Sequence, residues 1–317
     1  MKVLITDYDF PDIELEKNLF RDAGVDVVEA QCRTEDDVIA AARGCFGLLA
    51  QYAPMNARVF SALPEVRVVS RMGAGFDTVN VADAKRHGVW VSNSPDYGVG
   101  EVATHALGMA IALVRHLPFY DRDVRANNWH YTSAGALRRV ANMTLGIVGL
   151  GRIGKRMAHI SERVFGAVVA CDPYIPDADF PAYVKRRDLE SVFREADVVS
   201  LHVPLNDETR HLANAKLFAA MKRGSFLVNT ARGAVVNVDD VLAALDSGIL
   251  EGAALDVLPQ EPPPAGHAIL RHPRVMLTPH AAFYSIEAER ELRRKAAQNL
   301  VDWARKGRPT YVVSEGA

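Results

Sequence analysis

The chain has 317 residues, 49% of them hydrophobic, which is enough for two α/β domains. Its 37 basic and 39 acidic residues leave a net charge of −2, which gives no reason to propose a nucleic acid or membrane partner. Three widely spaced cysteines indicate neither a disulfide framework nor a metal site. Because Asp7 comes too early for a signal peptide and no apolar run could span a membrane, we predict a cytoplasmic protein.

Short apolar runs alternate with helical patterns through the first hundred residues. This alternation predicts a mostly parallel sheet with helices on both faces. One helix is opened by Thr34, whose spacing to Asp37 resembles a capping box. This half has no dinucleotide-binding glycine pattern, so we predict a separate small domain without a dinucleotide of its own. Its predicted strands are 3–6, 25–29, 47–50, 67–70 and 89–92.

An alanine-rich helical stretch, 99–128, follows and contains Pro118. We expect it to carry the chain from the first domain to the second. Its length offers a surface for dimer formation, although a plain packing helix explains the pattern equally well.

The stretch from Thr144 to Gly154 runs from an apolar strand into Gly-x-Gly-x-x-Gly and then into a helix. In such a motif Gly149 permits the tight turn, Gly151 the approach of a pyrophosphate and Gly154 close helix packing. The diphosphate would lie on free N–H groups at the helix N-terminus. The next apolar run ends in Asp172, which can accept hydrogen bonds from the ribose and would repel a 2′-phosphate. NAD is therefore favoured over NADP.

The second domain then repeats the strand and helix rhythm. We expect its last helix to return to, or bridge toward, the first domain and close a cleft between the two. Ligand chemistry would then lie at strand carboxyl ends and at a domain interface. The predicted strands are 144–148, 167–171, 197–201, 225–229, 252–255 and 275–277, and the predicted helices are 155–165, 188–195, 217–221, 238–247 and 287–305.

Three side chains, Arg232, Glu261 and His280, each follow one of these strands. The trio suits reduction of a 2-oxo acid, with His280 donating a proton to the carbonyl oxygen as hydride arrives. Glu261, bonded to His280, would favour the imidazolium and raise its pKa. Arg232 offers a planar fork for the substrate carboxylate. Singly, each could be an ordinary structural or surface residue, but their shared placement favours the catalytic interpretation.

Together these features resemble the D-isomer-specific 2-hydroxyacid dehydrogenase family, which includes formate, glycerate, D-lactate and 3-phosphoglycerate dehydrogenases and the C-terminal-binding proteins. The resemblance implies a formate/glycerate dehydrogenase-like α/β fold of two Rossmann-like, doubly wound parallel-sheet domains with a cleft between them. It assigns 1–98 plus 286–317 to the substrate domain and 99–285 to the NAD-binding domain. The motifs are Gly73-Ala74-Gly75-Phe76-Asp77, Gly149 to Gly154, His202-Val203-Pro204-Leu205, Asn229-Thr230-Ala231-Arg232-Gly233, Ala254-Leu255-Asp256-Val257, Glu261-Pro262 and Thr278-Pro279-His280.

The resemblance also implies roles for further residues. It maps the family's catalytic arginine, glutamate and histidine onto the trio above and implies D stereochemistry. Around the cofactor it implies Arg152 and Ile153 at the diphosphate, Asp172 at the ribose, His202, Val203 and Pro204 at the adenosine, Thr230 and Ala231 near the nicotinamide, and Asp256 accepting from its carboxamide.

In the small domain, N–H groups of Ala74 and Gly75 could cradle the substrate carboxylate. Gly73 belongs to the same turn, and Tyr52 and Arg71 are plausible neighbours. A packed aromatic and a surface charge are the alternative for those two. In the second domain, Phe283 beside His280 suggests room for an apolar or aromatic substrate group.

Residues 71–77 and 280–285 look most like the C-terminal-binding-protein branch, which has tryptophan in place of Phe283. We predict an NAD-dependent D-2-hydroxyacid dehydrogenase that prefers NADH, acts as a 2-oxo acid reductase, forms a homodimer and uses no metal. The alternative is an NAD(H)-sensing dimeric binding protein with weak or no turnover. A different hydride donor, such as phosphite, is a third possibility.

Overall fold

The computed structural model describes residues 1–316, which form two compact units. Unit 1 combines Met1–Gly98 with the segment that starts at Ser285, and unit 2 is Val99–Tyr284. We predicted the second boundary one residue later. Ser285 groups with unit 1 because its hydroxyl caps helix α11 by accepting a hydrogen bond from the backbone N–H of Ala288.

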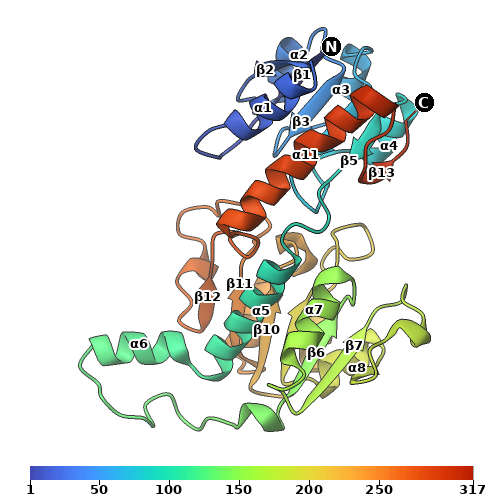
Figure 1. Cartoon of the computed structure of the whole chain (residues 1–317). Helices are drawn as coiled ribbons and strands as arrows, with labels where there is room; N and C mark the ends of the chain where they lie inside the picture. Colours follow the sequence, from blue (N-terminus) through green and yellow to red (C-terminus); the bar gives the residue numbers. More distant parts are fainter. Residues whose placement is uncertain (317) are drawn as a thin grey trace. The chain divides into compact units, whose positions relative to one another are not determined.

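Unit 1 is built on a six-stranded sheet of order β13-β5-β4-β3-β1-β2 (Figure 1). Strands β1 to β5 pair in parallel and are the five predicted strands. Strand β13 was not predicted, because three half-buried residues that pair antiparallel with β5 have no distinctive pattern. The strands are β1 (Lys2–Ile5), β2 (Asp26–Glu29), β3 (Gly47–Ala50), β4 (Val68–Arg71), β5 (Trp90–Ser92) and β13 (Val312–Ser314).

The helices of unit 1 include the expected capping box. Thr34 and Asp37 satisfy each other's backbone N–H groups at the start of α2. The last helix, α11, returns to unit 1 and packs on α1, β3 and β4, as Figure 1 shows in red. The helices are α1 (Glu14–Asp22), α2 (Glu35–Ala41), α3 (Ala57–Ala62), α4 (Val81–Arg86) and α11 (Ile286–Lys306).

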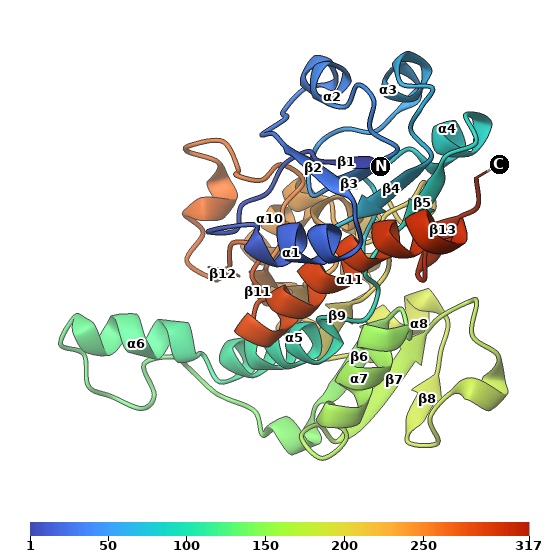
Figure 2. The same cartoon turned by 45° about the horizontal axis from the view of Figure 1, so that its top comes forward.

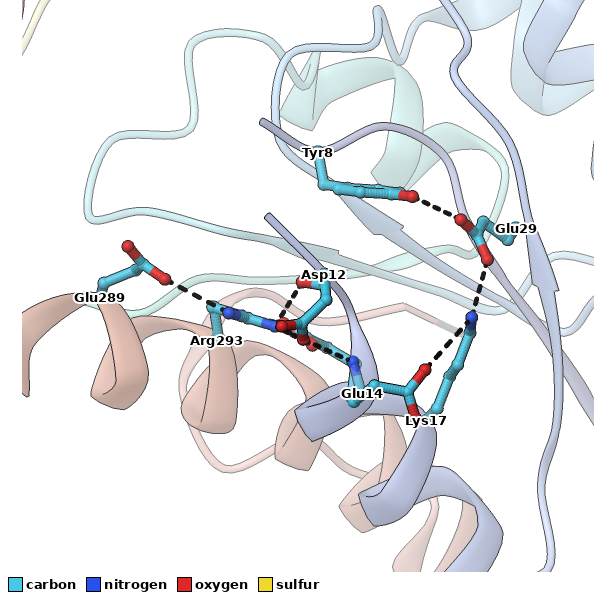
Figure 3. Close-up of polar contacts among 8 residues, drawn as sticks. Tyr8, Asp12, Glu14, Lys17, Glu29, Glu289 and Arg293 are labelled. Carbon is cyan, nitrogen blue, oxygen red and sulfur yellow. Dashed lines mark hydrogen bonds and ion pairs between the residues drawn. The ribbon is translucent and has the colours of Figure 1, made fainter. Parts of the chain in front are cut away.

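A buried ion pair fastens the two ends of the chain together within unit 1. The guanidinium of Arg293 on α11 donates to both carboxylate oxygens of Glu16 on α1, at 2.7 and 2.8 Å. It also donates to the carbonyl of Asp12 at 2.7 Å. Figure 3 shows Arg293 between Glu289 of its own helix and Asp12 of the N-terminal segment. Both members of the pair are buried, so each depends on the other for charge compensation.

Unit 2 is a seven-stranded parallel sheet of order β12-β11-β10-β9-β6-β7-β8. The chain winds outward from β6 in both directions, so the strand order reverses between β6 and β9. In open α/β sheets such a reversal leaves a ligand crevice beyond the strand carboxyl ends. The strands are β6 (Thr144–Val148), β7 (Ala167–Cys171), β8 (Val184–Arg186), β9 (Val198–Leu201), β10 (Ser225–Asn229), β11 (Leu250–Leu255) and β12 (Val275–Leu277).

Helices cover both faces of this sheet. Helices α5 and α7 lie side by side over β6 and share one apolar cluster with it (Figure 1). Helices α8, α9 and α10 pack in the other cluster. The α-helices are α5 (Val99–Val114), α6 (Leu117–Arg125), α7 (Arg152–Ser161), α8 (Leu189–Glu195), α9 (Ala215–Ala219) and α10 (Val238–Asp246), and single 3-10 turns are Val140–Asn142, Asp177–Asp179, Gly233–Val235 and Ala268–Leu270.

The helical stretch predicted over 99–128 consists of two helices, α5 and α6, and α6 ends at Arg125. The chain breaks at His116, whose φ is 52°, and α6 leaves at an angle of 57° to α5. Pro118 lies in the first turn of α6, where its missing N–H costs nothing, whereas inside a continuous helix it would clash with an earlier carbonyl. Among residues 1–316 no single helix is long and apolar enough to cross a membrane, and only the bent pair α5–α6 meets that test by length and composition.

Candidate active site

The three predicted catalytic side chains follow adjacent parallel strands of unit 2. Arg232 follows β10, Glu261 follows β11 and His280 follows β12, so all three loops leave the same edge of the sheet. The predicted hydrogen bond is present: Nδ1 of His280 lies 2.7 Å from Oε2 of Glu261. The other carboxylate oxygen of Glu261 accepts from the N–H of Leu258 at 2.8 Å. The histidine ring is therefore oriented by a carboxylate that is itself held by the backbone.

The charge of Glu261 follows from these contacts. Partial burial opposes its ionisation, but the hydrogen bond and charge of His280, the Leu258 N–H and the charge of Arg232 outweigh burial and lower the pKa of Glu261. A carboxylate on Nδ1 keeps the proton on that nitrogen. Nε2 is then the nitrogen that can exchange a proton with a substrate.

The turn that carries Arg232 is held by a residue that sequence reasoning missed. The amide of Asn229, fully buried at the end of β10, accepts from the N–H of Ala231 at 3.0 Å and donates to the carbonyl of Arg232 at 2.9 Å. Gly233 packs so closely on the Glu261 loop that a Cβ there would lie 1.9 Å from the carbonyl carbon of Leu258. These contacts bring the arginine turn against the glutamate loop.

Asp256 lies beneath the histidine loop. The residue is only 2% exposed. Its carboxylate accepts hydrogen bonds from the N–H groups of Ala281 and Ala282, at 2.8 and 3.0 Å, and from the hydroxyl of Thr278. Its backbone carbonyl accepts from the N–H of His280 at 2.8 Å. The structure thus assigns Asp256 to loop support, and its predicted contact with a nicotinamide carboxamide stays a prediction.

The glycine turn has the geometry that a pyrophosphate needs. Gly149 has φ of 90°, and a Cβ at Gly154 would lie 2.0 Å from the carbonyl oxygen of Gly149. A Cβ at Gly151 would meet no atom within 4 Å, so the backbone is open to a ligand there. Arg152 and Ile153 form the first turn of α7, which begins three residues earlier than predicted because Gly151 is its N-cap.

The remaining cofactor candidates lie at the ends of neighbouring strands. Asp172, after β7, accepts from the N–H of Leu150 in the glycine turn at 2.8 Å. His202 precedes Val203 and Pro204 after β9, and its backbone N–H donates to the carbonyl oxygen of Val148 at 2.7 Å. Burial lowers the pKa of its imidazole to about 4, so the ring is neutral at pH 7. The buried hydroxyl of Thr230 has no hydrogen-bond partner within residues 1–316, which fits a bound ligand at that position.

No group of three metal-binding side chains occurs in the part of the chain that the structure describes. The unpartnered hydroxyl of Thr230 and the open backbone at Gly151 together fit a dinucleotide.

The predicted substrate residues of unit 1 lie on two loops that follow adjacent strands. Tyr52 follows β3, and Arg71 ends β4 and leads into the turn formed by Gly73, Ala74 and Gly75. The guanidinium of Arg71 lies over Gly73, where a Cβ would be 1.3 Å from Nη1. The structure thus brings Arg71 and the glycine turn together.

A buried carboxylate holds the Tyr52 loop, and sequence reasoning missed it. Asp7, 6% exposed at the end of β1, accepts from the N–H groups of Gln51, Tyr52 and Ala53. The sequence signal was an aspartate directly after a buried strand, which is too common to single out. Phe283 of unit 2 lies edge-on to His280, with ring centroids 6.3 Å apart.

A comparison with known families decides the relationship. The family described as "D-isomer specific 2-hydroxyacid dehydrogenase, NAD binding domain" matches residues 107–282, more than half of the chain. The chain belongs to the D-isomer-specific 2-hydroxyacid dehydrogenase family. Unit 2 therefore contains the NAD-binding domain of this family, and the resemblance inferred from the motifs is confirmed. Its placement near the C-terminal-binding-protein branch stays a prediction.

The names of individual relatives specify different substrates and cofactors. The chain is 36% identical over 267 residues to a glyoxylate reductase of Korarchaeum cryptofilum, covering 83% of this chain and 80% of that one. It superposes with TM-score 0.87 and 25% identity on an Aquifex aeolicus D-lactate dehydrogenase complexed with NAD and lactic acid, covering 97% and 98% of the two chains. An NADPH-dependent glyoxylate/hydroxypyruvate reductase from Sinorhizobium meliloti has TM-score 0.87 and 26% identity, covering 99% and 96%.

Proposed function

We propose that the protein reduces a small 2-oxo acid to its D-2-hydroxy acid with NADH. The observation that carries the proposal is the 2.7 Å contact between His280 Nδ1 and Glu261 Oε2, on the same sheet edge as Arg232. NADH bound on the glycine turn would supply the hydride. The family supports the reaction class, and the residues of unit 2 support the roles.

Each catalytic side chain has one task in this proposal. Arg232 binds the substrate carboxylate through its planar fork and polarises the neighbouring carbonyl. His280 donates the proton on Nε2 to the carbonyl oxygen as the hydride reaches the carbon. Glu261 stabilises the imidazolium beforehand and keeps the ring oriented. In the reverse direction His280 accepts the hydroxyl proton.

We propose that NADH is preferred over NADPH. The family does not decide this, because one relative is NADPH-dependent. The argument rests on Asp172 at the end of β7, whose carboxylate can accept from ribose hydroxyls and would repel a 2′-phosphate.

The substrate proposal is a small acid with an apolar or aromatic side group. It rests on Phe283 beside His280 and on the adjacent ring of Tyr284, with centroids 6.5 Å apart. The names of the relatives add glyoxylate, and pyruvate as the 2-oxo acid that corresponds to D-lactate, to the acids that should be assayed.

We also propose a homodimer formed through an arm, residues 117–139, which extends from unit 2 (Figure 2). Trp129 and Tyr131 on the arm are 85% and 84% exposed. At its base lies a cavity of about 330 Å³, lined by apolar side chains such as Leu113, Phe119 and Phe226 and by charged ones such as Arg122 and Glu251. Large exposed apolar groups of this kind are typical of protein interfaces. The cytoplasmic location stays a prediction from composition.

The experiment that tests the function is a spectrophotometric assay of NADH oxidation with glyoxylate, hydroxypyruvate, pyruvate, phenylpyruvate and 3-phosphohydroxypyruvate. NADPH runs in parallel, and chiral analysis identifies the product enantiomer. Turnover with NADH to a D product supports the proposal. NADH binding without turnover of any acid, accompanied by a change in mass, would favour the NAD(H)-sensing alternative.

A further inference from the structure

We infer that His105 is a positioning residue of the active site, which acts through Thr278 and Asp256 on the loop that carries His280. The inference deepens the proposed function, since it gives the catalytic histidine a support on helix α5. Neither the sequence motifs nor the family assignment pointed to His105.

The contact itself has a defined direction. Nε2 of His105 lies 3.1 Å from the hydroxyl oxygen of Thr278, and that hydroxyl donates its proton to Oδ1 of Asp256. A hydroxyl has one proton, so towards His105 it can only accept. His105 must therefore carry a proton on Nε2. That nitrogen also lies 3.8 Å from the same Asp256 oxygen, so its N–H points into the carboxylate's surroundings.

The other end of this network is the catalytic loop. Asp256 accepts from the N–H groups of Ala281 and Ala282, and its carbonyl accepts from the N–H of His280. His280 itself has φ of 55°, a left-handed conformation that side chains other than glycine rarely adopt. Such a conformation persists where surrounding contacts enforce it. The Asp256 carboxylate supplies those contacts, and the Thr278 hydroxyl, oriented by His105, completes its set of donors.

His105 does not need this network to satisfy its hydrogen-bonding groups. Its side chain is 27% exposed, so water could form hydrogen bonds with its ring nitrogens. Instead it is directed at a partner 173 positions later in the chain. The two ends of the contact also lie close in sequence to the two places where the chain passes between units, 98/99 and 284/285. Helix α5 follows the first passage, and the loop 278–284 precedes the second. His105 thus ties together the two segments of unit 2 nearest to these passages.

The test uses two matched pairs of variants. His105→Leu removes the N–H donor, and His105→Gln restores one at a similar reach. Thr278→Val removes the hydroxyl with little change of shape, and Thr278→Ser retains it. His159→Leu, an exposed histidine on α7 outside the network, is the control. Because Thr278→Val leaves α5 untouched, the contact can be tested even if His105→Leu folds poorly.

We expect His105→Leu and Thr278→Val each to lower kcat for 2-oxo acid reduction about 10-fold, the size seen when supports of functional groups are lost. KM for NADH should change less than about twofold. The Gln and Ser variants should recover most of kcat. The double variant His105→Leu/Thr278→Val should be no slower than the slower single variant, because both changes break one network.

A second readout needs no substrate. Amide hydrogen exchange at Ala281 and Ala282 should accelerate in His105→Leu and Thr278→Val and stay unchanged in His159→Leu. If the wild type reduces no acid, the proposed function fails while the exchange data still test the network. The inference is overturned if exchange at these two amides is unaffected by both variants, or if His105→Gln is as slow as His105→Leu.

Discussion

The carboxyl-end edges of the two sheets use the same support in different ways. In unit 1 Asp7 lies two residues after β1 and accepts from three consecutive N–H groups of the loop after β3. In unit 2 Asp256 directly follows β11 and accepts from two consecutive N–H groups and a hydroxyl of the loop after β12. Both carboxylates are buried, and each replaces the partners that a further strand residue would have had.

The two edges differ in the side-chain contacts that join the supported loop to a neighbouring loop. In unit 2 the supported loop is also joined to a neighbouring loop by the His280–Glu261 hydrogen bond, so charged side chains are held from two sides. In unit 1 the supported loop presents Tyr52, which is 55% exposed and bonded to Asp9 at 3.2 Å. Gln51 of the same loop also donates to Asp9 at 2.6 Å, so both supported loops are joined to a neighbouring loop. The comparison teaches that the bond between loops in unit 2 joins two ionisable side chains suited to proton transfer, whereas in unit 1 it positions polar groups that suit binding.

The sharpest test of that division is His280→Ala, which removes the proton donor from the edge in unit 2. We expect kcat/KM to fall by about 10²–10⁴-fold, the usual contribution of general acid catalysis, with NADH affinity nearly unchanged. Steady-state kinetics and a fluorescence titration of NADH measure the two. Near-normal turnover in this variant would move the proton transfer elsewhere.

The substitution Arg293→Met removes the buried ion pair that joins α11 to α1 in unit 1. Glu16 is then left buried without a counter-charge, and we expect a loss of about 3–5 kcal/mol in the free energy of unfolding. Urea denaturation measures it. Changing Glu16 to Leu in the same chain should restore much of the loss, whereas a double variant as unstable as Arg293→Met would show that packing, not charge, dominates.

The buried support of the Tyr52 loop can be weakened by Asp7→Asn. An amide cannot accept from all three N–H groups, since its NH2 must face one of them, and we expect about 1–3 kcal/mol of destabilisation. If this edge binds substrate, KM for the 2-oxo acid rises more than kcat falls. Asp22→Asn, which changes an exposed carboxylate on α1 away from this loop, is the control. A fall in kcat with KM unchanged would contradict the division drawn above.

The smallest expected effect is a pH dependence that originates in unit 2. Burial lowers the pKa of His202 to about 4 from the model-compound value of 6.5. Between these values the unfolded chain binds a proton that the folded chain does not, so stability falls as the pH is lowered through that window. Relative to His202→Gln, the wild type should lose about 1 kcal/mol by pH 5, allowing for partial solvent screening. Denaturation curves of both proteins at pH 7 and pH 5 measure this loss. An equal change in the free energy of unfolding in both proteins would exclude a contribution from His202.

Local patterns in the sequence were enough for much of the fold and for the reactive residues. Buried parallel strands are short apolar runs, and each can be predicted from its own sequence without knowing which strands it pairs with. The glycine turn is equally local, because its three glycines serve one turn and one helix start. Arg232, Glu261 and His280 could be grouped because each follows a predicted strand, and the carboxyl ends of parallel strands lie at one edge of a sheet.

Only the tertiary structure decided which polar groups hold those loops. Asp7 and its three partners are more than 40 positions apart, and His105 and Thr278 are separated by 173. Pro118 marks a break in the helical stretch locally, but only the structure shows the left-handed backbone at His116 and the 57° bend. The sequence shows that a polar residue stands at the end of a strand. Which donors it meets is set by chain packing, because buried carboxylates take whatever N–H groups the fold brings within about 3 Å.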